Sequence, residues 1–409
     1  MKKTGSILIL SPWPSIFSMS GGGTPLASDL LETLLAAGYT VDFVAPRHED
    51  ADSFPMHSRL RVHRYGPLRV VIKGYPGRWV AWLERTIRLT ACALGVAIRY
   101  GRPRVVYGFS SLTIPAAVCS GLLLRRPTIG ALFGTFLHPH LGRTRGLLNH
   151  FEEAIAFKTP VDRLIILNDG TRGYEVARAL GVPEPRIRFW MHGLDLESCR
   201  AAMEADGRSE LGLPSSVPLV VSASRLAFWK HVDRILRAAP DVLEAKPDTL
   251  FAVSGDGPER QALETLVQEL SIAHAVRFLG VLPRDVNLRL IASADVFCSL
   301  YDYSNVGVAL LEALGCGVAV VVADTGATRE VVEDGANGLV VSPDDTSGTA
   351  AAIIRLVNEP DLRLRLGREA RRRAEDSFLT PEQRASLELE TIDELLARGD
   401  KEKPRTTFP

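Results

Sequence analysis

The feature that most constrains this chain is an alternation of short runs rich in β-branched residues with segments of helical periodicity. The alternation begins at Ser6–Leu10 and continues through Pro25–Ala37 and Thr40–Ala45. It is typical of a parallel sheet whose crossover helices cover both faces. We predict three further strands in the first half, at Val105–Tyr107, Thr128–Leu132 and Arg163–Leu167. The fold class is therefore α/β, with doubly wound sheets.

The same alternation starts again in the second half. The predicted strands are Leu219–Ser222, Leu250–Ser254, Val276–Leu279, Val296–Cys298, Ala319–Val322 and Gly338–Val341. Helices are predicted near His231–Leu243, Glu259–Glu269 and Val308–Leu314. A chain of 409 residues is long enough for two domains. We place them at 1–200 and 201–375, followed by a segment 376–409 whose helix, at Pro381–Leu396, would pack back on the first domain.

The longest uncharged stretch is Val105–Leu124, whose 20 residues match the length of a membrane-spanning helix. Gly108, Pro115 and Gly121 interrupt it, so a buried strand followed by a helix that ends at Arg125 is the better interpretation. The chain has five cysteines without a CxxC pair. An odd number of unpaired cysteines favours buried thiols in a reducing compartment, and hence a cytoplasmic protein.

The net charge of zero conceals an asymmetry along the chain. Residues 1–200 carry 25 Lys and Arg against 15 acids, whereas residues 201–409 carry 23 against 33. Between Arg59 and Arg145 there are 15 basic residues and one acid, Glu84, with aromatic residues interleaved. A basic, aromatic surface suits an anionic membrane or a phosphorylated acceptor, and the alternative is an ordinary solvated face.

Ligands of doubly wound sheets bind at the carboxyl ends of the strands. Two predicted strands of the second half end in suggestive loops. Ser222-Ala-Ser-Arg225 is followed by Lys230, which places two cations where they could bind a diphosphate. Ser254-Gly-Asp-Gly-Pro-Glu259 is a glycine turn that leads into a helix. Taken alone, each has a plainer explanation, a solvated loop or a strand–helix joint.

Two more strand ends have the same character. Tyr303–Gly307 leads into the predicted helix Val308–Leu314, and the N-terminus of a helix favours phosphate. Glu312, about one turn inside this helix, could accept hydrogen bonds from ribose hydroxyls or could simply stabilise the helix dipole. Thr325-Gly-Ala-Thr-Arg-Glu330 is another glycine loop after a strand.

Taken together and in this order, the motifs resemble glycosyltransferase family 4, the retaining glycosyltransferases of GT-B fold. In the first half, Gly21–Gly23 precede a helix closed by Gly38, and Val161–Asn168 and Met191–Asp195 are similar to family segments. The second half adds motifs at the family's spacing: Ser224-Arg-Leu with Lys230, Gly255-Asp-Gly-Pro-Glu, Phe278-Leu-Gly, Leu311-Glu-Ala-Leu-Gly-Cys-Gly317, Thr325–Glu330 and Asp334-Gly335. The resemblance implies two Rossmann-like domains that face a central cleft, the first binding the acceptor and the second the nucleotide-sugar.

The resemblance also implies the roles of individual residues. Arg225 and Lys230 would bind the donor diphosphate and stabilise the leaving group, and Glu312 would bind the ribose. His138 would face the sugar as a third catalytic residue. The other implied donor contacts are Gly22, Val281, Leu282, Ser304, Asn305, Val306, Gly307 and Val308.

One position departs from the family. Family 4 usually carries two glutamates in an E-x7-E spacing, but the residue eight positions before Glu312 is Ser304. Asp302 could replace the missing carboxylate, Ser304 and Asn305 could contact the sugar instead, or activity could have been lost. We favour contact through Ser304 and Asn305.

These considerations predict a metal-independent, front-face transfer that needs no cofactor beyond the nucleotide-diphosphate sugar. Its acceptor would be a glycan or a lipid-linked glycan, with no role for nucleic acid. The basic 59–145 region would hold the cytoplasmic enzyme at the inner face of a membrane. The alternatives are a nucleotide-sugar epimerase or phosphorylase of the same architecture, and a non-catalytic nucleotide-sugar binder.

Overall fold

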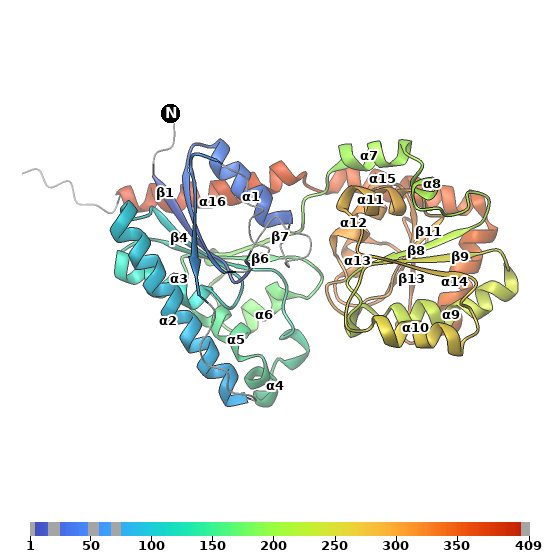
Figure 1. Cartoon of the computed structure of the whole chain (residues 1–409), viewed down its shortest axis with the longest axis horizontal. Helices are drawn as coiled ribbons and strands as arrows, with labels where there is room; N and C mark the ends of the chain where they lie inside the picture. The colour runs from blue at the N-terminus through green and yellow to red at the C-terminus, as the bar shows by residue number, and fades with distance from the viewer. Residues whose placement is uncertain (1–4, 15–24, 48–56, 67–74, 402–409) are drawn as a thin grey trace, which may run out of the picture. The chain divides into compact units, whose positions relative to one another are not determined.

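The computed structural model describes residues 5–14, 25–47, 57–66 and 75–401, which form two compact units (Figure 1). Unit 1 comprises Met1–Asn168, Arg172–Trp190 and Pro381–Pro409, and unit 2 comprises Asp169–Thr171 and Met191–Thr380. The main division thus falls after residue 190 and after residue 380, where the sequence suggested 200 and 375.

The first boundary lies earlier because α7 (Leu196–Glu204) belongs to unit 2. This helix packs against α11 (Arg284–Ala292) and α12 (Val308–Gly315). Its Cys199 and Ala202 are buried in the core of that unit. The second boundary coincides with the start of α16 (Pro381–Lys401), which packs against α1 (Pro25–Ala36) in unit 1.

The described part of unit 1 contains a seven-stranded sheet in the order β3-β2-β1-β4-β5-β6-β7, with every neighbouring pair parallel. Its strands are β1 (Ser6–Leu10), β2 (Thr40–Pro46), β3 (Leu60–Tyr65), β4 (Val105–Phe109), β5 (Thr128–Leu132), β6 (Arg163–Leu167) and β7 (Ile187–Trp190). The five central strands match those predicted. The edge strands β3 and β7 were not predicted.

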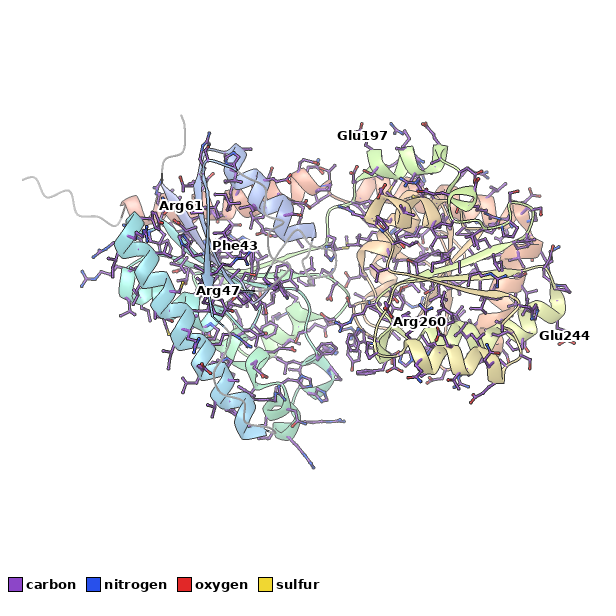
Figure 2. The ribbon with its side chains drawn as sticks, in the orientation of Figure 1. Phe43, Arg47, Arg61, Glu197, Glu244 and Arg260 are labelled. Carbon is purple, nitrogen blue, oxygen red and sulfur yellow. The ribbon has the colours of Figure 1, made fainter. Side chains whose placement is uncertain are left out.

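Strand β3 escaped prediction because its sequence, Leu-Arg-Val-His-Arg-Tyr, is not an apolar run and none of its residues is fully buried. Arg61 and His63 instead bind the carboxylate of Asp42 on β2, at 2.7 and 2.9 Å. Figure 2 labels Arg61 on this edge and Phe43, whose buried ring lies in the core. Because β3 is an ion-paired edge strand, its sequence lacks the continuous apolar run by which buried parallel strands are recognised.

Helices cover both faces of this sheet. Leu30 and Leu34 of α1, with Ile392 and Leu395 of α16, pack on the face that includes Phe43. Helices α2 (Tyr75–Tyr100) and α3 (Ile114–Leu124) pack on the opposite face. The remaining helices of the unit are α4 (Thr144–Asn149), α5 (Phe151–Lys158), α6 (Gly173–Ala179) and the short 3-10 turns His138–His140 and Glu184–Arg186.

Unit 2 contains, in the described residues, a six-stranded parallel sheet in the order β10-β9-β8-β11-β12-β13. Its strands are β8 (Leu219–Ala223), β9 (Leu250–Ser254), β10 (Val276–Gly280), β11 (Val296–Ser299), β12 (Ala319–Ala323) and β13 (Leu339–Val341). All six lie where the sequence predicted strands. Four of them, β8, β9, β11 and β12, are short runs buried along their whole length. The strand order reverses between β8 and β11, so the carboxyl ends of these two strands form the topological switch point.

The helices of unit 2 also lie on both faces of its sheet. Helices α9 (Val232–Ala245), α10 (Arg260–Glu269) and α14 (Thr346–Asn358) enclose one core, and α7, α11, α12 and α15 (Pro360–Ser377) enclose the other. Two short helices, α8 (Gly207–Glu210) and α13 (Thr328–Val331), and the 3-10 turn Phe228–Lys230 complete the unit.

The uncharged stretch Val105–Leu124 forms β4 and α3, as the sequence indicated. Pro115 lies in the first turn of α3, which ends with Arg125 in the left-handed conformation. Across residues 5–14, 25–47, 57–66 and 75–401, no helix combines the length and apolar character needed to cross a bilayer.

Candidate functional site

The switch point of unit 2 carries the two predicted cations. The chain leaves β8 through Ser224 and the exposed Arg225, and a 3-10 turn then carries Lys230. The Nζ of Lys230 donates a 2.8 Å hydrogen bond to the carbonyl of Ser304 and lies 4.2 Å from the ring centre of Tyr301. Burial lowers the pKa of Lys230 to about 8, although the nearby Asp169 opposes this shift. An anion that enters this site would favour the protonated lysine.

The glycine turn after β9 supports the Arg225 loop. A Cβ atom on Gly255 would lie 1.9 Å from the carbonyl oxygen of Ser224, and one on Gly257 would lie 2.3 Å from that of Leu226. The Leu226 amide donates to the carbonyl of Asp256 at 2.9 Å. Only glycine permits this approach of two backbones. The Gly-Asp-Gly motif therefore shapes the loop that presents Arg225.

The loop after β11 lies at the same switch point. Ser304 has a left-handed backbone with φ of 52°. The Val306 amide donates to the carbonyl of Asp169 at 2.9 Å, and Gly307 is the N-cap of α12. The first N–H groups of a helix have no acceptor within the helix, so the turn beginning at Val308 can receive a phosphate oxygen.

Asn305, which the sequence suggested as a sugar contact, has a buried side chain that links two loops. Its side chain is buried, and the residue is only 1% exposed. Its amide nitrogen donates to the carbonyl and hydroxyl oxygens of Thr325 and, at 2.8 Å, to the hydroxyl of Thr328. The side chain is thus committed to protein contacts, and the predicted contact of this residue with the donor stays a prediction. Asn305 holds the loops after β11 and β12 together.

The segment Asp169–Thr171 packs against the same loop and was not predicted. A Cβ atom on Gly170 would lie 1.7 Å from Asn305 Oδ1, so this close contact requires glycine. Asp169 is 4% exposed, accepts a 2.6 Å hydrogen bond from the Thr171 hydroxyl, and also bonds the side chain of Ser304. Burial raises the pKa of this carboxyl group, against the effect of these hydrogen bonds and of Lys230.

Asp302, the other candidate for the missing carboxylate, is held by two basic side chains. His231 Nε2 lies 2.8 Å from Asp302 Oδ2, and Arg234 Nη1 donates to Asp302 Oδ1 at 2.7 Å. Both carboxylate oxygens are thereby engaged. This arrangement gives Asp302 a structural role and argues against its replacing the sugar-facing glutamate.

Glu312 lies in the second turn of α12 and is 5% exposed. Burial raises its pKa to about 7, although Arg284, whose Nε lies 3.7 Å from Glu312 Oε1, opposes this shift. A buried carboxylate with one distant partner can accept further hydrogen bonds from ligand hydroxyls. The predicted ribose contact is compatible with this environment and stays a prediction.

Val281 and Leu282 follow β10, where the family resemblance places the nucleotide base. Val281 is 63% exposed, and Leu282 is partly buried against the core of the unit. The Gly255 amide donates to the carbonyl of Gly280 at 2.7 Å, which holds this loop beside the loop after β9. The backbone contact of these residues with a base stays a prediction.

The two predicted residues of unit 1 are separate cases. His138 lies in a short 3-10 turn, and its Nε2 is 3.1 Å from the carboxylate of Glu175. Its proposed contact with the sugar stays a prediction. Gly22 lies outside the described residues.

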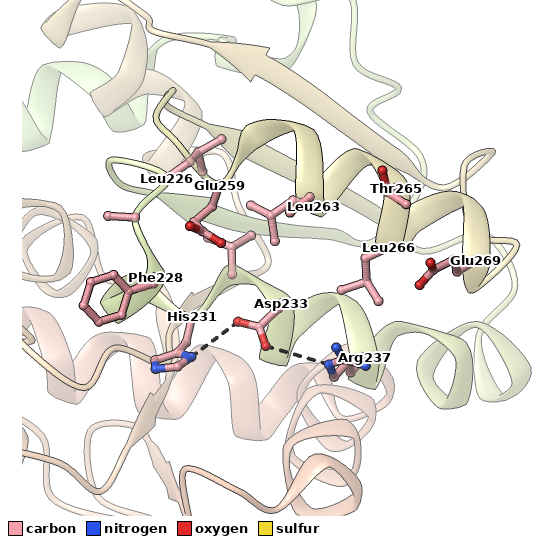
Figure 3. Close-up of a pocket in the computed structure, with 13 residues that line it drawn as sticks. Leu226, Phe228, His231, Asp233, Arg237, Glu259, Leu263, Thr265, Leu266 and Glu269 are labelled. Atoms are coloured by element: carbon pink, nitrogen blue, oxygen red, sulfur yellow. Dashed lines mark ion pairs between the residues drawn. The ribbon is translucent and has the colours of Figure 1, made fainter.

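A pocket of about 500 Å³ lies along α9 and α10 (Figure 3). Leu263 and Leu266 line it from α10, and Asp233 on α9 pairs with His231 and Arg237 at 3.4 and 3.7 Å. Neither the predicted cations nor Glu312 line this pocket. Leu226, Ala227 and Phe228, which lie between the two cations in sequence, line it, so it adjoins the switch-point site without including its charged residues.

Part of the chain, including the loops of this site, matches a known family model. Residues 204–373 match the family model described as glycosyl transferases group 1. This part of the chain contains Arg225, Lys230 and Glu312.

Individual relatives agree with this result. An uncharacterized glycosyltransferase of Methanocaldococcus jannaschii is 26% identical over 349 residues, which cover 83% of this chain and 86% of that protein. A GDP-mannose-dependent alpha-(1-6)-phosphatidylinositol monomannoside mannosyltransferase of Mycolicibacterium smegmatis is 32% identical over 213 residues, or 49% of this chain and 55% of that protein. The match to the second relative thus spans only about half of its length.

The fold also matches a solved structure. A sucrose-phosphate synthase of Thermosynechococcus elongatus superposes with a TM-score of 0.76 at 21% identity, covering 96% of this chain and 100% of that one. The fold is therefore GT-B, with two Rossmann-like parallel-sheet domains.

Proposed function

We propose that this chain is a retaining glycosyltransferase that moves a sugar from a nucleotide-diphosphate donor to a glycan or lipid-linked acceptor. The observation that carries the proposal is the placement of Arg225, Lys230, the N-terminus of α12 at Gly307–Val308, and Glu312 around the switch point of unit 2. Two cations and a helix N-terminus suit a diphosphate. The name of the mycobacterial relative, which is GDP-mannose-dependent, supports a nucleotide-sugar as the donor.

The proposed chemistry is an attack on the same face of the sugar that the diphosphate leaves. The bond from the anomeric carbon to the diphosphate oxygen breaks, and its electron pair goes to the leaving group. The acceptor hydroxyl forms the new bond to that carbon, and its proton passes to an oxygen of the departing diphosphate. Lys230 and Arg225 stabilise the developing negative charge, so that the transfer needs neither a metal ion nor a cofactor.

Asp169 and Ser304 give the sugar end of this site its particular character. Ser304 stands where the family usually has glutamate, and the carboxylate of Asp169 bonds its side chain. Because the Ser304 hydroxyl donates to Asp169, its oxygen lone pairs can accept a hydrogen bond from the sugar. We place the enzyme in the cytoplasm, where its five free cysteines would stay reduced.

Thermal shift with a panel of UDP-, GDP- and ADP-sugars tests the donor site. We expect at least one to stabilise the protein, and Arg225→Ala or Lys230→Ala to remove both the shift and transfer. The matched control is Arg355→Ala, an exposed arginine on α14. Absence of stabilisation by every nucleotide-sugar would refute the donor site.

Transfer assays separate the finer parts of the proposal. Activity that survives EDTA supports metal independence, and a product with the anomeric configuration of the donor supports retention. An inverted product would refute the front-face mechanism. Because Ser304 replaces the usual carboxylate, a non-catalytic binder is the second candidate. Donor binding without transfer to any glycan or lipid-linked acceptor would favour it.

A further inference from the structure

The outward face of α2 in unit 1 is apolar along its length. Val80, Leu83, Ile87 and Ile98 are 38, 51, 59 and 87% exposed. Their spacing places them on one side of the helix, because 3, 4 and 11 residues each correspond to nearly whole turns. The opposite side buries residues such as Leu89 against the sheet. Figure 1 shows α2 along the outside of unit 1.

The neighbouring helix extends this surface. Helix α3 packs against α2, and its Leu122 and Leu123 are 74 and 63% exposed. Across the described residues of unit 1, every large hydrophobic side chain of high exposure lies on α2, α3 or α4: Val80, Leu83, Ile87, Ile98, Tyr100, Leu122, Leu123 and Leu148. Exposed apolar side chains that gather in this way mark an interaction surface. We call the α2 and α3 members of this set the apolar face.

The charges around the apolar face are mainly positive, although Arg78 at the start of α2 pairs with Glu152 of α5 at 2.6 Å. Between Arg78 and Leu148 the chain has ten arginines and a single acid, Glu84. Arg88 neutralises that acid, with its Nε 2.8 Å from Glu84 Oε1. Arg99 at the end of α2 and Arg125 at the end of α3 are exposed. The partner must therefore combine an apolar phase with negative charge.

A pocket adjoins the N-terminal end of α2. It has a volume of about 500 Å³ and is lined mostly by apolar side chains, including Trp79, Leu147, Phe151 and Ile155. The Trp79 ring, next in sequence to Val80, stacks on Phe151 with 3.7 Å between ring centres. A lining of this kind suits an apolar ligand such as a hydrocarbon chain.

We propose that the apolar face docks onto a bilayer that contains anionic lipid. The apolar side chains would enter the interface between headgroups and acyl chains, while the arginines would bind the headgroups. A second copy of the chain suits the face poorly, since pairing two such faces would bring together two sets of arginines. Docking would place a lipid-linked acceptor within reach of the enzyme, and only this consequence depends on the proposed function.

Vesicle co-sedimentation tests the proposal. We expect the purified chain to bind vesicles of phosphatidylcholine with phosphatidylglycerol and to bind phosphatidylcholine alone weakly. Because Leu83 and Ile87 are exposed, a Leu83→Gln/Ile87→Gln variant should fold normally and lose about tenfold or more in partitioning. The matched control is Leu364→Gln, which changes a 55% exposed leucine on α15 of unit 2 and should leave vesicle binding unchanged.

A second variant examines the charges. Arg99→Gln/Arg125→Gln should lower binding to anionic vesicles and make the remaining binding less sensitive to salt. Donor binding in unit 2, measured by thermal shift, should be unchanged in all these variants. Failure of vesicle binding with intact donor binding would refute the docking face alone.

Three outcomes would overturn the proposal. The wild-type chain could fail to bind anionic vesicles, or it could bind them as tightly after substitution of Leu83 and Ile87 as before. Light scattering could instead show a dimer that the same double variant abolishes, which would assign the face to self-association.

Discussion

The pKa of Lys230 leads to a sharp prediction about donor binding and pH. Burial lowers this pKa to about 8, from 10.5 for an exposed lysine. The donor diphosphate is anionic and favours the protonated amine. The apparent affinity of the free protein should follow the protonated fraction of Lys230, which is about one half at pH 8 and about one tenth at pH 9. Affinity should therefore fall by about fivefold between these two values.

The same reasoning predicts a measurable uptake of protons. When the donor binds at pH 8, about half a proton per site should be taken from the solution, because the lysine is then about half neutral. Isothermal titration in two buffers of different ionisation enthalpy measures this number directly. The nucleotide that gives the largest thermal shift is the ligand for this titration.

Lys230→Arg supplies the control, since a guanidinium stays protonated throughout this range. If this variant binds the donor, its affinity should change little between pH 8 and 9, and its proton uptake should be close to zero. The reasoning would be refuted by a wild-type affinity that is constant between these values, or by an equal fall in Lys230→Arg.

Three further predictions concern neighbouring residues. The pKa of Glu312 is about 7 in the folded protein, against 4.5 for an exposed glutamate. The folded state therefore holds the proton more tightly than the unfolded state, which stabilises folding at low pH, and this stability is lost as the pH rises through 7. Denaturant unfolding should therefore find Glu312→Gln up to about 3 kcal/mol more stable relative to wild type at pH 8 than at pH 4.5, with weaker donor binding; equal effects at both values would contradict this. Gly255→Ala should disturb the Arg225 loop and weaken donor binding, because its Cβ would lie 1.9 Å from the Ser224 carbonyl oxygen. The control is Gly212→Ala, whose Cβ would meet no atom within 4 Å; with a φ of +64°, it should cost only about 1 kcal/mol of backbone strain. The comparison fails if both variants bind the donor equally well. Asp169→Asn should shift the midpoint of the pH titration of donor affinity below 8, because Asp169 raises the pKa of Lys230, and an unchanged midpoint would show that the two groups are not coupled.

Four of the six strands of unit 2 could be predicted from sequence because burial on both faces gives them an almost continuous apolar run. Leu219–Ala223 and Ala319–Ala323 are examples in which every residue is buried. The motifs at their carboxyl ends then placed the cations correctly at the switch point. Local sequence is sufficient to predict a strand where all residues of the segment have the same buried environment.

Helix α2 and strand β3 were not predicted because their environments are mixed. The apolar residues of α2 lie on both sides of the helix, since Leu89 is buried and Ile87 is exposed.

The direction of each side chain in the loop after β11 could not be predicted either. Spacing placed Ser304 and Asn305 near the sugar, but the left-handed backbone at Ser304 and the three hydrogen bonds of the Asn305 amide are tertiary features. Asp169 is more than a hundred positions away in the sequence and follows a strand of the other unit. No local pattern links it to Ser304.

The contact between Asp169 and Ser304 changes how the absence of the family's usual glutamate at position 304 is interpreted. A carboxylate is present at this end of the site, but it belongs to a buried residue that is 4% exposed and reaches the loop through a serine hydroxyl. Because this group is buried, we expect it to act on the sugar only indirectly, by orienting the Ser304 hydroxyl and by favouring, through its charge, the protonated form of Lys230. A neutral hydroxyl in place of a carboxylate forms a weaker hydrogen bond with the sugar. Binding of the donor should accordingly depend more on its diphosphate, held by Arg225 and Lys230, than on the identity of the sugar.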